Sequence, residues 1–179
     1  MVAAKAIIRL IDLTATTRAF FQMNQKEKIP AHAKRELERF VRWAAVDGGY
    51  ACPHPLPNLI IEAVDLNIGG AGIENYMQNR LKKLAEQHRE FWLKDKDPLA
   101  VGKGPWTERP PVLYGLFIIN TVLMVLTVDP TKGPDAHVSY QVEVSLNQQN
   151  QGVWNAITIA IVVCLARDGM VARRKYFER

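Results

Sequence analysis

Apolar residues recur every three or four positions in four segments of the chain, which is the spacing of one face of an α-helix. These segments predict helices over residues 3–23, 30–46, 73–93 and 149–168. The third helix has the clearest buried stripe, formed by Ile73, Met77, Leu81, Leu84, His88 and Phe91. The apolar run 156–166 of the last helix is rich in β-branched residues, which lowers its helix propensity and leaves a strand as the alternative.

Four shorter apolar segments, rich in β-branched residues and bounded by turn signals, predict strands. They cover residues 58–64, 112–119, 122–128 and 138–146. The last segment alternates strictly between apolar and polar positions. We expect it to pair antiparallel with 122–128 and to turn five side chains toward the core: Val138, Tyr140, Val142, Val144 and Leu146.

The order of these segments predicts an α+β (or α/β) fold, in which a small mixed sheet of about four strands is packed by four helices, two of them N-terminal. With 179 residues, the chain is long enough to bury a substantial core as one domain. We therefore expect a single α/β domain over 1–179, with a basic C-terminal tail at 169–179. Residues 69–72 are expected to form a flexible turn. Residues 95–111, which include Trp106 and several prolines, are expected to form a surface loop.

The longest apolar stretch, residues 112–128, has 17 positions, the lower limit for a membrane-spanning helix. Polar residues such as Tyr114 and Asn120 interrupt it, so we expect no membrane span. Cys52 and Cys164 show no metal-ligand spacing, which favours free thiols in a reducing compartment. The N-terminus lacks the pattern of a signal peptide, and we expect an intracellular protein, either nuclear or cytoplasmic.

The formal net charge of +5 is concentrated in basic clusters. The second predicted helix places three arginines on the face opposite its apolar residues: Arg35, Arg39 and Arg42. Such a stripe is either a solvated face neutralised by Glu38 or a binding surface for nucleic acid and other anions. The C-terminal cluster has the same two interpretations; it contains Arg173, Arg174 and Lys175.

Asp47 stands beside Gly48-Gly49. Fifteen positions later, Glu62 lies at the centre of an apolar segment that is predicted to be a strand. This arrangement resembles the core of PD-(D/E)XK nuclease-like domains. The resemblance, which covers about residues 30–168, implies that the two carboxylates hold Mg²⁺ while a lysine two positions after the glutamate supports the attacking water. Val64 occupies that position here. The resemblance therefore implies an incomplete site, unless Lys82 or Lys83 on the next helix supplies the cation.

Two classes of function follow from these patterns. The absence of a complete catalytic set favours a non-catalytic protein-interaction module in a larger intracellular assembly, built on a degenerate nuclease-like fold. The alternative is a metal-dependent nuclease or another nucleic-acid-processing enzyme that uses Asp47, Glu62 and Mg²⁺; otherwise we expect no cofactor. We expect a protein partner, with nucleic acid or a second copy of the chain as alternatives. Trp154, near the start of the last helix, is expected in the core, with a binding surface as its alternative.

Overall fold

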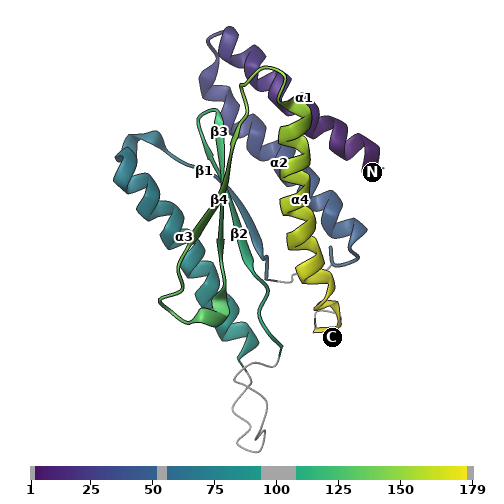
Figure 1. The fold of residues 1–179 in the computed structure, drawn as a ribbon, viewed down its shortest axis with the longest axis vertical. Helices are drawn as coiled ribbons and strands as arrows, with labels where there is room; N and C mark the ends of the chain where they lie inside the picture. Colours follow the sequence, from purple (N-terminus) through teal and green to yellow (C-terminus); the bar gives the residue numbers. More distant parts are fainter. Residues whose placement is uncertain (1–2, 52–55, 94–107, 177–179) are drawn as a thin grey trace, which may run out of the picture.

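The computed structural model describes residues 3–51, 56–93 and 108–176, and this part of the chain forms four α-helices and one four-stranded sheet (Figure 1). In chain order the elements are α1 (Ala3–Gln22), α2 (Ile29–Asp47), β1 (Leu59–Ala63), α3 (Gly69–Trp92), β2 (Leu113–Ile119), β3 (Val122–Val128), β4 (Ser139–Ser145) and α4 (Gly152–Val171). The predicted α+β fold is confirmed, and the segment 156–166 is helical.

The sheet has the strand order β1-β2-β3-β4 and is mixed. β1 and β2 run parallel, with α3 as the crossover between them, whereas β2, β3 and β4 are joined as antiparallel neighbours. Residues 112–128 therefore form a hairpin. Only two residues separate its strands, and Asn120 takes the left-handed conformation there, with φ of 56°. Asparagine tolerates this conformation better than most residues, which allows the tight connection.

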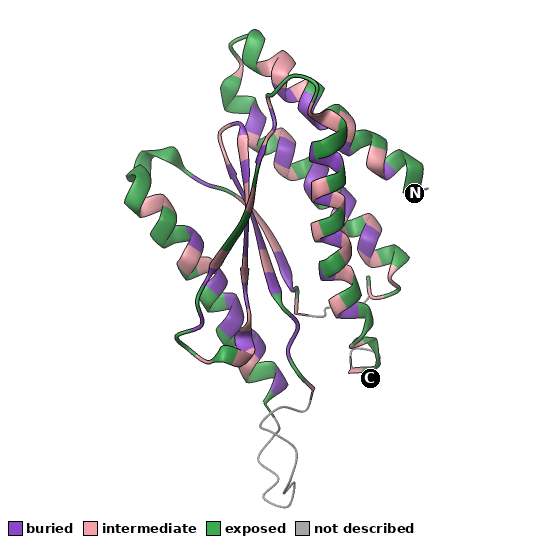
Figure 2. Ribbon diagram, viewed as in Figure 1, coloured by how far each residue is buried: buried purple, intermediate pink, exposed green. Residues whose placement is uncertain are grey.

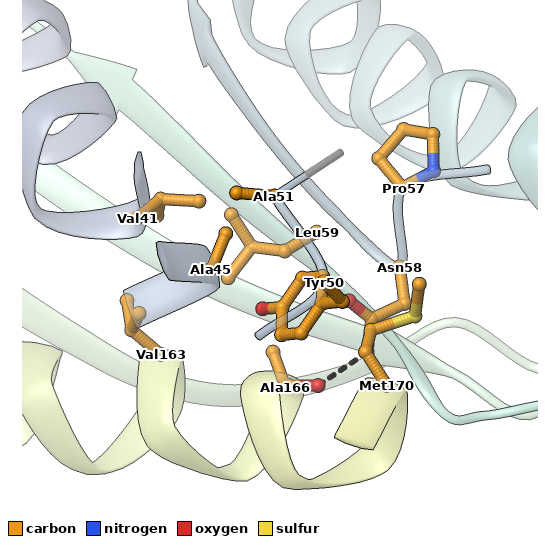
Figure 3. Close-up of a pocket in the computed structure, with 10 residues that line it drawn as sticks. All are labelled: Val41, Ala45, Tyr50, Ala51, Pro57, Asn58, Leu59, Val163, Ala166 and Met170. Carbon is orange, nitrogen blue, oxygen red and sulfur yellow. Dashed lines mark hydrogen bonds between the residues drawn. The ribbon is translucent and has the colours of Figure 1, made fainter. Parts of the chain in front are cut away.

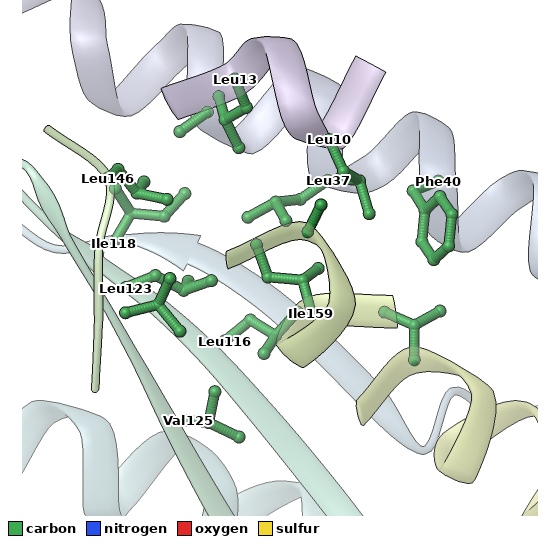
Figure 4. Close-up of a cluster of buried hydrophobic side chains, with 14 of the residues drawn as sticks. Leu10, Leu13, Leu37, Phe40, Leu116, Ile118, Leu123, Val125, Leu146 and Ile159 are labelled. Carbon is green, nitrogen blue, oxygen red and sulfur yellow. The ribbon is translucent and has the colours of Figure 1, made fainter. Parts of the chain in front are cut away.

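Three helices and one helix cover opposite faces of the sheet. α1, α2 and α4 lie on one side and α3 lies on the other, so the buried positions of all four helices point inward (Figures 1 and 2). Figure 4 shows the core of the three-helix side, where helix residues pack over β2, β3 and the end of β4. Its labelled residues are Leu10, Leu13, Leu37, Phe40, Leu116, Ile118, Leu123, Val125, Leu146 and Ile159.

A second core lies between α3 and the other face of the sheet. Glycine at position 115 lets the helix approach β2 closely, because a Cβ there would overlap the Phe117 ring and lie 3.2 Å from Leu81. The predicted α3 stripe is confirmed except at its end, where Trp92 is buried and Phe91 is 52% exposed. The helical spacing explains this difference, since Trp92 follows the buried His88 by four positions.

The expected flexible turn at residues 69–72 is wrong, because these residues form the first turn of α3. Gly69 enters the helix with φ of 71°, a conformation that glycine adopts without strain. The low helix propensity of the following glycines is offset because each residue added to an existing helix gains a backbone hydrogen bond.

The predicted antiparallel pairing of β3 with β4 is confirmed, but the expectation that five β4 side chains share one face is wrong. Val125 pairs with Val142 and Leu126 pairs with Tyr140, so Gln141 is an extra residue in β4. This β-bulge reverses the facing of the residues before it. Val142, Val144 and Leu146 face the three-helix side, whereas Val138 packs on the α3 side and Tyr140 is 54% exposed. The alternating pattern did not reveal this change because it ignores register.

Candidate functional site

Asp47, the first carboxylate of the nuclease-like motif, ends α2 and forms an ion pair with α4. Its side chain is half exposed, and Oδ2 accepts a hydrogen bond of 2.8 Å from Nη1 of Arg167. Arg167 also donates through Nε to Asp168 at 3.0 Å. The hydrogen bond to Asp168 is the main reason that the pKa of Arg167 lies above its ordinary value. Asp47 therefore helps to tie the C-terminal ends of α2 and α4 together.

Glu62, the second carboxylate of the motif, lies on β1 and is held from α3. Its carboxylate accepts hydrogen bonds from Nε of Arg80, at 2.8 and 3.0 Å, and from the Tyr76 hydroxyl. Burial alone would raise the pKa of Glu62, but the hydrogen bonds from Arg80 and Tyr76 and the charge of Arg80 together hold it below its ordinary value. Glu62 is therefore a stably ionised partner in a local network.

The two carboxylates of the motif are engaged on different sides of the sheet. Asp47 is bound from the three-helix side and Glu62 from the α3 side. Within residues 3–51, 56–93 and 108–176, no group of three or more His, Cys, Asp and Glu residues is placed to hold a metal ion. Val64 is buried on the α3 side. Lys82 and Lys83 are exposed on α3, and the basic group that reaches Glu62 is Arg80.

The arginine stripe of α2 is exposed, as predicted, but the acid that neutralises it differs from the expected one. Glu36, which is largely buried, pairs with Arg39 at 2.6 Å and with Arg35 at 3.4 Å. Glu38 instead lies 3.9 Å from Lys34. Arg42 is also exposed. Two of the three predicted anion-binding arginines therefore already share a carboxylate.

The residues of the C-terminal basic cluster form contacts at the C-terminal end of α4. The predicted C-terminal tail begins later than expected, because residues 169–171 belong to α4 itself. Arg173 donates to the carbonyl oxygens of Gly169, at 2.6 Å, and Arg109, at 2.7 Å. Burial lowers the pKa of Arg173. Lys175 is 4.0 Å from Glu108, and Arg174 also has an interaction partner, so this cluster is tied to its surroundings.

An apolar cavity of about 300 Å³ opens between α2, α4 and the residues that lead into β1 (Figure 3). Its lining residues are Val41, Ala45, Tyr50, Ala51, Pro57, Asn58, Leu59, Val163, Ala166 and Met170. The Asn58 side chain is held by α4, because its Nδ2 donates to the Ala166 carbonyl at 2.7 Å. Burial raises the pKa of Tyr50, which stays protonated at neutral pH. None of the described residues that line the cavity is therefore an activated nucleophile or a general base at neutral pH.

His88 is a satisfied core residue, as predicted. Its ring is buried between the Pro57 carbonyl, 3.0 Å from Nε2, and the Trp92 indole, whose N–H donates to Nδ1 at 3.3 Å. Burial lowers the pKa of His88 to about 4, so the ring is neutral at pH 7. The neutral form with the proton on Nε2 satisfies both contacts. Of the two cysteines, Cys164 is a free thiol and Cys52 lies outside the described residues.

α4 carries an exposed apolar surface, and it includes Trp154, which the sequence interpretation placed in the core. Trp154 is 65% exposed, Ile161 is 55% exposed and Leu165 is 54% exposed, so the expectation of a buried Trp154 is wrong. Together with Ile157 they form what we call the α4 outer face. At 3.6 residues per turn the four residues fall within an arc of about 80°, opposite the buried Ile159 and Val163.

The composition of α4 is that of a helix buried on every side. Residues 152–166 contain no charged side chain. Among the described residues, α4 is the one helix long and apolar enough to cross a membrane by length and composition, and 39% of its most apolar window is buried inside the chain. A helix that is apolar all round is expected to be covered all round. The domain covers only the inner side of α4.

Comparisons with protein-family models, with curated proteins and with solved structures gave no match to this chain. The description of function therefore depends on the geometry of the sites alone. The surface loop predicted at residues 95–111, with Trp106, lies outside the described residues except for positions 108–111.

Proposed function

We propose that the chain is a non-catalytic protein-interaction module of an intracellular assembly, and that the α4 outer face is its docking surface. The observation that carries the proposal is the exposure of Trp154, Ile161 and Leu165 on a helix with 15 consecutive uncharged residues. Single exposed apolar residues are ordinary, but a contiguous apolar surface marks an interaction site. Tryptophan at such a surface supplies a large contact area.

The rigidity of α4 supports this role. Its inner side packs into the main core through Ala156, Ile159 and Val163, and Asn155 donates to Thr14 at 3.0 Å and to the Ser145 carbonyl at 2.9 Å. These contacts fix the rotation of the helix, so the outer face is presented without an ordering step. A preformed surface loses less conformational entropy on binding than a mobile one.

A metal-dependent nuclease, the alternative from the sequence, has less support. Its chemistry needs Asp47 and Glu62 to share a cation. Each carboxylate is instead held by its own arginine, Arg167 or Arg80. The exposed stripe of Arg35, Arg39 and Arg42 keeps nucleic acid as a second class of partner, which salt-dependent binding would test.

Site-specific photo-crosslinking in cells tests the docking surface. A photoreactive phenylalanine analogue is placed at position 161 of the full protein and, as the control, at position 46 of α2, where Val46 is 62% exposed and is not part of the α4 outer face. We expect a crosslinked protein of higher mass from position 161 and none from position 46. The absence of any protein adduct at position 161 would refute the proposal.

A further inference from the structure

We infer that the partner of the α4 outer face is a second copy of this chain, packed antiparallel through α4 about a twofold axis near Ile161. The inference rests on the proposed function, since it names the partner of the same surface. In such an isologous contact one patch meets itself, so the patch must be self-complementary in shape, charge and length.

The spacing of the face is that of a helix-pairing seam. Trp154, Ile157, Ile161 and Leu165 follow one another at intervals of three, four and four residues. Intervals of three and four residues keep these side chains on one face of the helix, from which they can pack into the grooves of a facing helix. The partner that best fits this seam is a second helix with the same spacing, and α4 itself has it.

The charges of the face favour a copy of α4 over a helix of another kind. No charge lies between residues 152 and 166, so a charged partner surface would be buried without a counterion. A second α4 brings an equally uncharged surface. With Ile161 on the axis, Ile157 packs against Leu165 of the partner subunit. Trp154 then lies opposite the partner subunit's Asp168, which has a 63% exposed side chain with oxygen acceptors for the indole N–H.

The size of the face meets the lower limit for a specific contact. From the exposed fractions of its residues, each copy presents on the order of 500 Å² of apolar surface, which lies in the range of the largest, often functional, patch of a monomer. Pairing two copies removes on the order of 1,000 Å² from water, about the minimum for a biological interface. In the antiparallel arrangement the two helix dipoles also point in opposite directions, which places the positive end of each helix beside the negative end of the other.

The other exposed edges of the fold are poorer routes to self-association. β4 is an edge strand, but its bulge at Gln141 interrupts the regular row of backbone groups that strand addition needs. β1, the opposite edge, has only five residues. Insertion of α4 into a membrane would strip Ile159 and Val163 from the main core, which the antiparallel pair leaves intact.

Disulfide trapping with the purified full chain tests the arrangement. In a background in which Cys52 and Cys164 are replaced by serine, three single-cysteine chains are made: Ile161→Cys, Ile157→Cys and Leu165→Cys. An antiparallel pair centred on residue 161 brings Ile161→Cys close to its own copy and brings position 157 close to position 165 of the partner subunit.

We expect Ile161→Cys to form a covalent dimer alone under mild oxidation, and Ile157→Cys and Leu165→Cys to form one efficiently only when mixed. Val46→Cys, the exposed control, should form none. Failure of both trapped pairs would overturn the second-copy inference. If the crosslink at position 161 in cells then joins a protein of another mass, the docking function stands with a different partner. If both experiments fail, both proposals are wrong. In that case, binding of the wild type to lipid vesicles that Ile161→Glu abolishes would identify a lipid surface as the occupant of the α4 outer face.

Discussion

Arg80 of α3 forms an ion pair with Glu62 of β1, and this contact joins the crossover helix to the edge strand that it follows in the chain. The pairing uses the carboxylate that the nuclease-like motif would assign to a metal. It gives Glu62 a structural role that can be measured through stability.

Replacing Arg80 by methionine should lower the free energy of unfolding at pH 7 by about 1 kcal/mol or less, because the Arg80 side chain is 40% exposed and solvent screens the pair. The folded-state pKa of Glu62 lies below its unfolded value, so this stabilisation is present above the unfolded pKa and is lost as the pH falls through the folded pKa. Denaturant unfolding at pH 7 and pH 3 measures both effects. Lys82→Met, on the exposed side of α3, is the control and should change little; an equal loss in both variants would contradict the pairing.

The chain should not hydrolyse DNA or RNA in the presence of Mg²⁺ or Mn²⁺. Asp47 and Glu62 are bound by different arginines, and Val64 cannot supply the charge of a lysine. Losing one positioned electrostatic group typically costs about 3–4 kcal/mol of transition-state stabilisation. The measurement is cleavage of a labelled duplex and a labelled single strand. Metal-dependent cleavage that disappears in Glu62→Ala would show that the account of this site is wrong.

His88 should make folding sensitive to mild acid. Its folded-state pKa is about 4, below the unfolded value near 6.5, so the unfolded chain binds the proton first as the pH falls between these values. This group should therefore cost the fold roughly 3 kcal/mol by pH 4. Stability measured from pH 7 to pH 4 should fall less steeply in His88→Gln than in the wild type. His137→Gln, at an exposed site, is the control, and an unchanged slope in His88→Gln would contradict the assignment.

The arginine stripe of α2 should behave as a solvated face. Glu36 holds Arg35 and Arg39, which reduces the charge available to phosphates. We expect the triple variant of Arg35, Arg39 and Arg42 to alanine to bind short nucleic acids no more weakly than the wild type at low salt. Wild-type binding that falls steeply with salt through counterion release, and that the triple variant lacks, would contradict this prediction.

Local patterns predicted the helices and strands to within a few residues, because the apolar spacing that marks each element lies within one short stretch of sequence. The bulge at Gln141 escaped prediction because register depends on the pairing of two strands. The partners of the candidate site also escaped it. Arg80 lies 18 positions after Glu62, and Arg167 lies 120 positions after Asp47, so only the folded chain brings each pair together.

Trp154 shows a different limit of sequence interpretation. An uncharged helix predicts burial, and Trp154 was therefore expected in the core of this domain. The apolar pattern does not state which surface covers the helix. Inner and outer sides of α4 are both apolar, so the exposed side could be recognised only once the sheet, α1 and α2 were seen to occupy the inner one.

The molar mass of the purified protein, measured by light scattering over a range of concentrations, tests the α4 pairing most directly. The wild type should approach twice 20.2 kDa as the concentration rises. Ile161→Glu, which places a charge at the centre of the α4 outer face, should stay at 20.2 kDa with an unchanged circular dichroism spectrum, whereas Val46→Glu should behave as the wild type. A wild-type protein that stays at 20.2 kDa at every concentration would contradict the account.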